Sequence, residues 1–265
     1  MKIEIAPDVE AEWMHLVEYR QRLQACPIAW IPLGLVEWHS EHLPLGLDGI
    51  KARALCVAAA RRAGGIVLPV NWWNRPGLAN LEGTMVFTAE CMQRLLTEIL
   101  EEVEISGFKV AVVLTGHYGK TQENAVREIA EAFQRSHALK VWALTEKELI
   151  VGETILGWKA HGDHAGTSET ALLLAIAPEL VKMDRATNEP LVHYRPISYN
   201  HKRLPHEEDS QAAAVFPGQP NPAVFHVFHK VTPVATRELG QAIFARIVEK
   251  LADGARKRLR SHAEA

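Results

Sequence analysis

The chain has 265 residues, of which 48% are hydrophobic and 23% charged, so we expect a globular protein with one domain over residues 1–265. A net charge of −3 without a stripe of Lys or Arg argues against a nucleic-acid partner, and no apolar run reaches the roughly 18 residues of a membrane span. The acidic N-terminus is unlike a signal peptide and the three cysteines fit no disulfide framework, so we expect a cytoplasmic location.

Strand and helix patterns alternate along the chain. In chain order they predict a helix over 10–23, a strand over 29–36, a helix over 48–62 with Asp48 as its cap, a strand over 66–70, a loop over 71–85, a helix over 88–106, a strand over 108–114, a helix over 122–137, a strand over 139–144 and helices over 168–177 and 237–260. Residues 186–230, rich in proline and histidine, are predicted to be a long irregular excursion.

This alternation predicts an α/β fold with three layers, in which helices cover both faces of a mostly parallel central sheet. Folds of this kind bind ligands outside the carboxyl ends of their strands. Clusters of polar side chains follow the strands that end near residues 36 and 114, and tryptophans follow the strand at 66–70. We therefore expect these segments, which are far apart in the sequence, to meet at one rim of the sheet.

Glu37, His39 and Asp48 form the first cluster. Glu37 and His39 point the same way on an extended chain, and the Pro/Gly loop between them and Asp48 allows the chain to return. Glu, His and Asp suit a borderline divalent ion such as zinc, manganese or iron, and a bridging carboxylate can hold two of them. The alternative is a solvated, charged turn.

His117 is the ligand-type residue of the second cluster, residues 115–119. Gly116 and Gly119 flank it at the end of the predicted strand over 108–114 and leave room for its imidazole to reach over the rim. A histidine that caps the following helix is an equally good interpretation of this pattern.

The third cluster precedes the predicted helix over 168–177 and contains His164 and Glu169. His164 is a candidate general acid or base, because the unperturbed pKa of histidine lies near working pH. Glu169 is a candidate ligand, or else an acid in the first turn of a helix, where the helix dipole favours it.

Aromatic side chains lie beside these clusters, and we predict that they bind the substrate. Trp72 and Trp73 stand in a predicted loop, where a substrate lid and a subunit contact are the two alternatives. Tyr118 follows His117, and Trp158 lies shortly before His164.

Three motifs in this order resemble the creatininase (creatinine amidohydrolase) family. Residues 37–44, Glu-Trp-His-Ser-Glu-His-Leu-Pro, with Asp48 four residues on, match the family pattern E-x-H-G-x-H-L-P, with Ser40 in place of glycine. Residues 115–117 correspond to N-G-H, and residues 164–170 to H-A-G-x-x-E-T. Leu156-Gly157-Trp158 and the A-x-x-E-x-G pattern at 235–240 extend the resemblance over nearly the whole chain.

The resemblance implies a metal-dependent amidohydrolase, commonly a hexamer, with two divalent ions per subunit (zinc, manganese or both, with iron as a further candidate). It implies that Glu37, Asp48 and His117 hold one ion, that His39 and the bridging Asp48 hold the other, and that His164 transfers the proton.

Two departures concern the second ion and the substrate. In creatininase a glutamate two residues after the N-G-H histidine completes the second metal site, and Gly119 stands here instead. We predict that Glu169 replaces that ligand, with Glu123 as the weaker candidate. Residues 80–84 also lack the histidine and proline of the family's H-x-F-P-G-T loop, so the resemblance leaves the identity of the substrate open.

The leading functional hypothesis is therefore hydrolysis of a non-peptide C–N bond in a small amide, either cyclic, such as a lactam or a creatinine-like ring, or linear, such as a formamide. The rival hypothesis is a non-catalytic protein that binds a metal or a metabolite. Retention of His164 beside the ligand-type residues favours catalysis, because a binding protein needs no proton shuttle.

Overall fold

A four-stranded parallel sheet lies at the centre of the computed structural model, which describes residues 5–74, 82–85, 87–187 and 231–263. The strand order is β2-β1-β3-β4, with β1 at Ile28–Leu33, β2 at Ile66–Val67, β3 at Val110–Thr115 and β4 at Lys140–Thr145. Leu33 of β1 pairs with Thr115 of β3, and Thr115 pairs with Thr145 of β4. The three strands therefore end side by side and open onto one rim.

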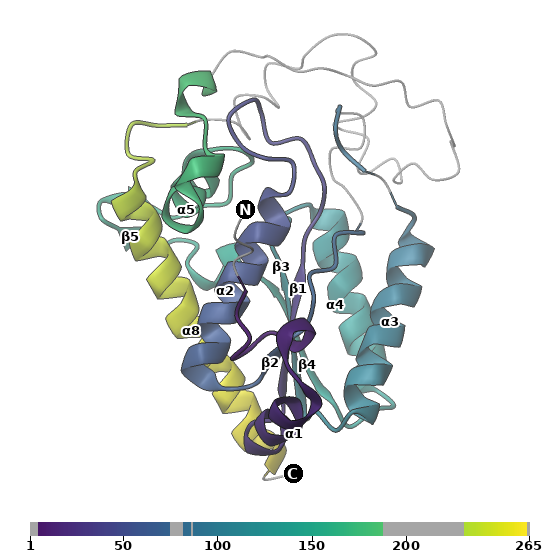
Figure 1. Ribbon diagram of the computed structural model, residues 1–265. Coiled ribbons are helices and arrows are strands. Elements are labelled where there is room, and N and C mark those ends of the chain that lie inside the picture. Colours follow the sequence, from purple (N-terminus) through teal and green to yellow (C-terminus); the bar gives the residue numbers. More distant parts are fainter. Residues whose placement is uncertain (1–4, 75–81, 86, 188–230, 264–265) are drawn as a thin grey trace.

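Helices cover both faces of this sheet, which confirms the predicted α/β fold (Figure 1). One face of β1 and β3 packs in a hydrophobic cluster with α2 (Leu47–Ala63), α5 (Thr167–Ile176) and α8 (Arg237–Ala263). Alternate residues of the same strands pack against α3 (Ala89–Ile105) and α4 (Lys120–Gln134) on the other face. Because β1 and β3 are buried on both faces, their sequences are continuous apolar runs.

Several boundaries differ from the sequence-based expectation. The helical pattern over 10–23 divides into a 3-10 turn at Ala11–Trp13 and α1 at Leu16–Ala25, and the strand expected over 66–70 is only β2. A small antiparallel hairpin of β5 (Thr154–Ile155) and β6 (Trp158–Lys159) was not predicted, because two-residue strands carry no periodic signal. The remaining 3-10 turns lie at Glu146–Leu149, Pro178–Leu180 and Met183–Arg185. Most of the predicted excursion, 188–230, and part of the predicted loop, 75–81, lie outside the described residues.

The prediction that Asp48 caps a helix is wrong. The helix α2 begins at Leu47 with Gly46 at the capping position, and Asp48 belongs to its first turn. Its carboxylate turns toward His39 and His117 instead of toward the backbone N–H groups of its own helix.

Close backbone contacts hold the first turn of α2 against the ends of β1 and β3. A Cβ atom on Gly34 would lie 2.4 Å from Cα of Gly49, and a Cβ on Gly116 would lie 2.1 Å from the carbonyl oxygen of Asp48. Real Cβ atoms do not come this close, so only glycine fits at Gly34 and Gly116. Because Gly34 and Gly116 have no side chains, the first turn of α2 can approach the backbone there, and Asp48 lies between the ends of β1 and β3.

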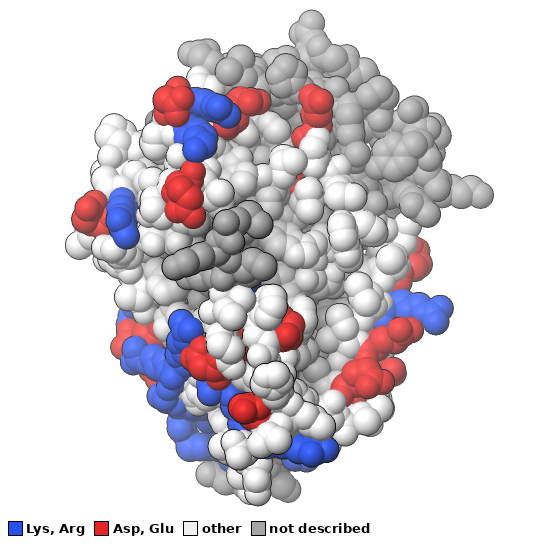
Figure 2. Space-filling view, in the orientation of Figure 1, with Lys and Arg blue, Asp and Glu red and all other residues white. Residues whose placement is uncertain are grey.

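Charged side chains on the surface lie intermixed. Figure 2 shows Lys and Arg next to Asp and Glu on the visible face. Arg61 and Asp8 illustrate this mixture, since the guanidinium donates two hydrogen bonds of 2.9 Å to the carboxylate. No helix in the described ranges combines the length and the apolar character that crossing a membrane requires.

The glycine of the A-x-x-E-x-G pattern also has a structural reason. The side chain of Thr236 accepts a hydrogen bond from Leu239 N at 3.2 Å and so caps the start of α8. One residue later, a Cβ on Gly240 would lie 1.8 Å from the carbonyl oxygen of Ala171 in α5. Gly240 therefore lets α8 pack directly on α5, the helix that carries Glu169.

We expect Gly240→Ala to lower the free energy of unfolding by about 1–3 kcal/mol, because the added methyl group must push the two helices apart. Urea denaturation followed by circular dichroism measures this change. The control is Gln241→Ala, an exposed position on the same helix, for which we expect a change within about 0.5 kcal/mol. Equal stabilities of the two variants would contradict the close helix contact.

Candidate metal centre

The ligand-type residues predicted from the sequence meet at the rim of the sheet. Glu37 and His39 follow β1, His117 follows β3, and Asp48 and Glu169 lie in the first turns of α2 and α5. Each of these five side chains is at most 5% exposed. Three overlapping groups place their ligand atoms within 4.8 Å of one another: Glu37, Asp48 and His117; His39, Asp48 and Glu169; and Glu37, His39 and His164.

Asp48 lies at the centre of this cluster and faces two histidines. Its Oδ1 is 3.3 Å from Nε2 of His39, and its Oδ2 is 3.4 Å from Nδ1 of His117. On the His117 side, Oε2 of Glu37 lies 2.9 Å from the same Nδ1. The two oxygens of Asp48 thus belong to different groups, which is the arrangement of a carboxylate that can bridge two cations.

Glu169 completes the His39 side. Its Oε2 lies 3.8 Å from Nε2 of His39 and accepts a hydrogen bond of 2.7 Å from Ala165 N. The start of α5 is fixed by Asp163, which accepts hydrogen bonds from the backbone and the hydroxyl of Ser168 at 2.7 and 2.6 Å. Asp163 therefore orients the helix that presents Glu169.

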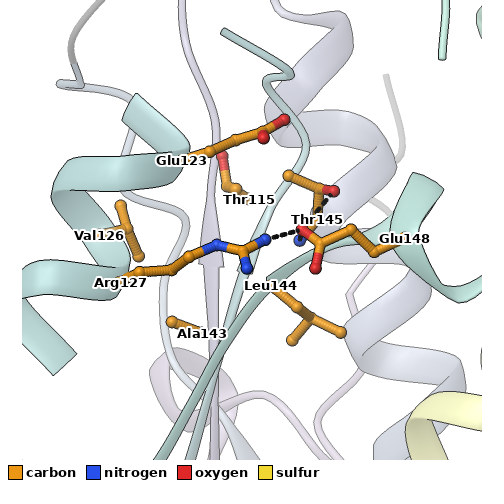
Figure 3. A pocket seen from close by; sticks show the side chains of 8 residues that line it. All are labelled: Thr115, Glu123, Val126, Arg127, Ala143, Leu144, Thr145 and Glu148. Carbon is orange, nitrogen blue, oxygen red and sulfur yellow. Dashed lines mark hydrogen bonds and ion pairs between the residues drawn. The ribbon is translucent and has the colours of Figure 1, made fainter. Parts of the chain in front are cut away.

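Glu123, the weaker candidate, points elsewhere. It forms an ion pair with Lys147 and lines a pocket between α4 and the end of β4 (Figure 3). The same pocket contains the ion pair of Arg127 and Glu148, with 2.5 Å between Nη2 and Oε1. Glu123 belongs to none of the three groups of close ligand atoms found among the described residues.

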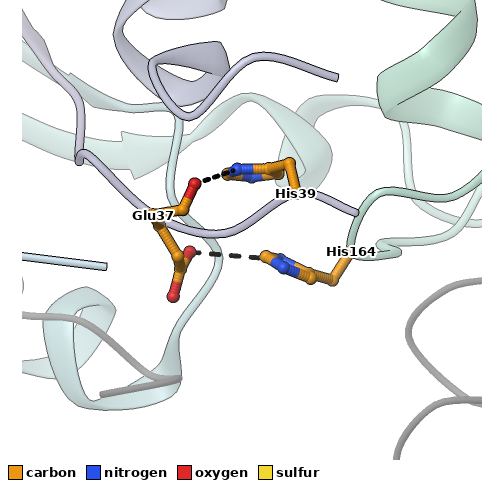
Figure 4. Close-up of side chains that lie close together, drawn as sticks. All are labelled: Glu37, His39 and His164. Atoms are coloured by element: carbon orange, nitrogen blue, oxygen red, sulfur yellow. Dashed lines mark hydrogen bonds and ion pairs between the residues drawn. The ribbon is translucent and has the colours of Figure 1, made fainter. Parts of the chain in front are cut away.

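The orientation of the His39 ring suits a bound cation. Nδ1 of His39 lies 3.0 Å from the carbonyl oxygen of Glu37 and donates to it (Figure 4). Nε2 is then the nitrogen that faces Asp48 and Glu169 and could bind a cation in place of a proton. This Nε2 and both carboxylate oxygens of Asp48 are buried without a hydrogen-bond partner. Buried polar atoms of this kind require partners, and a divalent ion between them would supply one.

The electrostatics of the cluster also favour a cation. Burial alone would lower the pKa values of His39 and His117, but the nearby carboxylates raise them to about 9 and about 10. Burial would raise the pKa of Glu37 and Asp48, but His117 lowers that of Glu37 and His39 lowers that of Asp48. The buried carboxylates therefore stabilise positive charge strongly at this place.

His164 lies at the edge of the cluster, with Nδ1 4.0 Å from Oε2 of Glu37 (Figure 4). Its Nε2 donates to the carbonyl oxygen of Trp38 at 2.6 Å, and its ring stacks on Trp38 at 5.8 Å between centroids. Burial and the neighbouring His39 lower its pKa. A neutral His164 held in this way keeps its lone pair on Nδ1, on the side of Glu37.

Three residues of the site were not predicted from the sequence. Lys51 is completely buried one turn after Asp48, and Glu146 follows β4, the one strand end without a predicted site residue. Trp38 lies between Glu37 and His39 in the first motif. A lysine one turn after a predicted metal ligand and an acid at the end of a strand were the available signals.

The predicted aromatic residues take different places. Trp72 packs on the first turn of α2, where a Cβ on Gly49 would lie 2.3 Å from its ring, while Trp73 is 45% exposed. The hydroxyl of Tyr118 donates to Oε1 of Glu146 at 2.7 Å. Trp158 is buried in the hydrophobic cluster that α2 and α8 share. These contacts do not test a role in substrate binding, which stays a prediction for all four.

Comparisons with known proteins identify similar sequences. A family model described as creatininase, creatinine amidohydrolase, matches residues 12–254. The chain is 25% identical over 261 residues to creatinine amidohydrolase of Pseudomonas putida, which covers 91% of this chain and 93% of that protein. It is 30% identical over 176 residues to the mycofactocin precursor peptide peptidase of Mycobacterium ulcerans (strain Agy99), over 60% of this chain and 62% of that protein.

Solved structures extend the similarity to the fold. The structure named Creatininase Mn is 24% identical, covers 94% of this chain and 98% of its own, and superimposes with a TM-score of 0.71. The family model spans nearly the whole chain, and the parallel sheet and the motif residues lie in the matched region. The chain therefore belongs to the creatininase family.

Proposed function

We propose that the protein hydrolyses a C–N amide bond of a small molecule with the help of two divalent metal ions, zinc, manganese or both, with iron as a further candidate. The arrangement of Asp48 carries this proposal, since one oxygen faces His39 and the other faces His117. In this proposal Glu37, Asp48 and His117 form the first metal position, and His39, Asp48 and Glu169 form the second. Solved creatininases named as a manganese form and as a zinc–zinc type support this choice of metals.

Bound divalent ions supply Lewis-acid chemistry, which activates water and polarises an amide carbonyl. The chain provides the proton transfer. Nδ1 of His164 takes a proton from the attacking water and gives it to the departing nitrogen. The hydrogen bond from Nε2 to the carbonyl oxygen of Trp38 keeps the ring in one orientation. Stacking on Trp38 further restricts rotation of the imidazole.

A small cyclic amide, creatinine-like or a lactam, is the first candidate substrate, and a formamide is the second. One solved creatininase variant is a complex with creatine, which supports a small ligand of this kind. A peptide amide is a further candidate, because the chain is 30% identical to a peptidase over 176 residues. A homo-oligomer, hexameric by family resemblance, and a cytoplasmic location also stay predictions.

Metal analysis and a substrate screen test the proposal together. We expect the protein to take up two divalent ions per subunit, and the loaded protein to release product from one class among lactams, creatinine, formamides and short peptides. Metal content is measured by mass spectrometry and product by chromatography. Binding of no ion after supplementation with manganese and zinc would overturn the proposal, and two ions without turnover of any class would favour the non-catalytic alternative.

We expect Asp48→Asn to lose both ions, because a neutral amide cannot bridge and neutralise two cations. Metal content after dialysis is the measurement, and circular dichroism checks the fold. The control is Asp184→Asn, an exposed acid. Two retained ions in Asp48→Asn would contradict the bridging role.

His164→Ala should keep its metal ions and lose about 10²- to 10⁴-fold in kcat on the substrate found, the usual contribution of general acid–base catalysis. The matched control is His161→Ala, an exposed histidine three residues earlier, which should keep normal turnover. If metal is lost with His164, the residue is a ligand of the Glu37, His39 and His164 group instead.

Glu169→Gln should reduce the metal content from two ions toward one, with the ion at Glu37 and His117 retained. Glu123→Gln is the control, and its two ions should remain, since Glu123 pairs with Lys147. Metal analysis of both variants decides the assignment, and the reverse result would make Glu123 the ligand.

A further inference from the structure

Lys51 places a buried positive charge directly behind the second metal position. Its side chain is completely buried, and its Nζ lies 2.6 Å from Oε1 of Glu169 and 3.0 Å from Oε1 of Glu146. Oδ1 of Asp48 is 3.9 Å away, and the ring centroid of Tyr118 is 4.1 Å away. Lys51 thus joins four segments of the rim through one ammonium group.

We propose that Lys51 makes the second metal position the weaker of the two, so that the protein holds one ion tightly and exchanges the other. The inference rests on the proposed function, because it assumes that ions bind at both positions. The inference concerns the difference in affinity for a metal ion between the two positions. The number of ligands does not explain such a difference, because each position offers three protein ligands.

The first reason is that the two carboxylate oxygens of Glu169 face different partners. Oε1 accepts from Lys51, while Oε2 accepts from Ala165 N and faces Nε2 of His39 at 3.8 Å. Only one oxygen of Glu169 is directed at the second position. An ion there cannot gain the second carboxylate oxygen without displacing the ammonium of Lys51.

The second reason is the position of the charge. Lys51 approaches Oδ1 of Asp48, the oxygen that faces His39, and not Oδ2, which faces His117. Among the described residues, no ion pair joins Lys51 to Glu37 or His117. A like charge raises the free energy of a nearby cation, and the effect falls with distance, so Lys51 disfavours an ion at the second position more than one at the first.

Glu146 moderates this effect. Its Oε1 accepts from both Lys51 and the hydroxyl of Tyr118, and its side chain is completely buried. The negative charge of Glu146 offsets part of the positive charge of Lys51. Removing the charge of Lys51 and removing the charge of Glu146 should therefore change the affinity of the second position in opposite directions.

Manganese titration of the metal-free protein tests the inference, with affinity measured by calorimetry and free ion counted by electron paramagnetic resonance. We expect two classes of site in the wild type. Lys51→Met should bind the second ion at least about tenfold more tightly and leave the first nearly unchanged, because a like charge close to the second position is gone. Glu146→Gln should weaken the second ion.

Two further variants serve as a substitute and as a control. Lys51→Gln keeps a hydrogen-bond donor without the charge and replaces Lys51→Met if that variant does not fold. Lys147→Met removes the other ammonium group near the Tyr118 ring, 4.8 Å from its centroid, and should leave both affinities unchanged.

The outcomes separate the inference from the proposed function. Two equal sites in the wild type, or a second ion that weakens in Lys51→Met as well as in Glu146→Gln, would overturn the inference and leave the two-metal proposal intact. The latter result would mean that Lys51 only holds the structure together. A wild-type protein that takes up no manganese or zinc would overturn both.

Discussion

Electrostatic repulsion among buried carboxylates is the constraint on which the rim of this protein depends. Glu37, Asp48, Glu146 and Glu169 are at most 1% exposed and converge from four segments of the chain. Charged groups removed from water require nearby charges of the opposite sign, or they become neutral. Lys51 is one positive charge that the chain itself supplies, because burial would lower its pKa but Glu146 and Glu169 raise it well above its usual value. The carboxylates that raise the pKa values of His39 and His117 also make this side of the rim suitable for divalent ions.

The carboxylates can converge only because the backbone is packed unusually closely beneath them. Gly34 and Gly116 allow the first turn of α2 to touch the ends of β1 and β3. Gly119 has a similar effect on the ligand itself, since a Cβ there would lie 2.3 Å from Nε2 of His117. Gly119 therefore provides the space for the imidazole, and a carboxylate for the proposed second metal position would have to come from another element.

Two residues at the site adopt left-handed backbone conformations that favour glycine. Ser40 has a φ of 60° and stands where the family pattern has glycine, and Ala165 has a φ of 49°. Such conformations cost roughly 1–2 kcal/mol per non-glycine residue. At Ala165 the conformation accompanies the hydrogen bond from its N–H to Oε2 of Glu169. Strain of this kind is common where surrounding contacts fix a functional geometry.

The sequence by itself determined the α/β class, the succession of the main strands and helices, and the motif residues at the ends of β1 and β3, because apolar periodicity and strand ends are local signals. Gly34, Gly116 and Gly240 also stand in the sequence, but their neighbours Gly49, Asp48 and Ala171 are distant along the chain. The roles of Lys51, Glu146 and Trp38 were decided only by the tertiary structure. A buried lysine has meaning only through the acids that surround it, and Glu169 lies 118 residues from Lys51. The position of Glu169 inside the cluster and of Glu123 outside it likewise depends on the direction of two helices, which local sequence patterns do not contain.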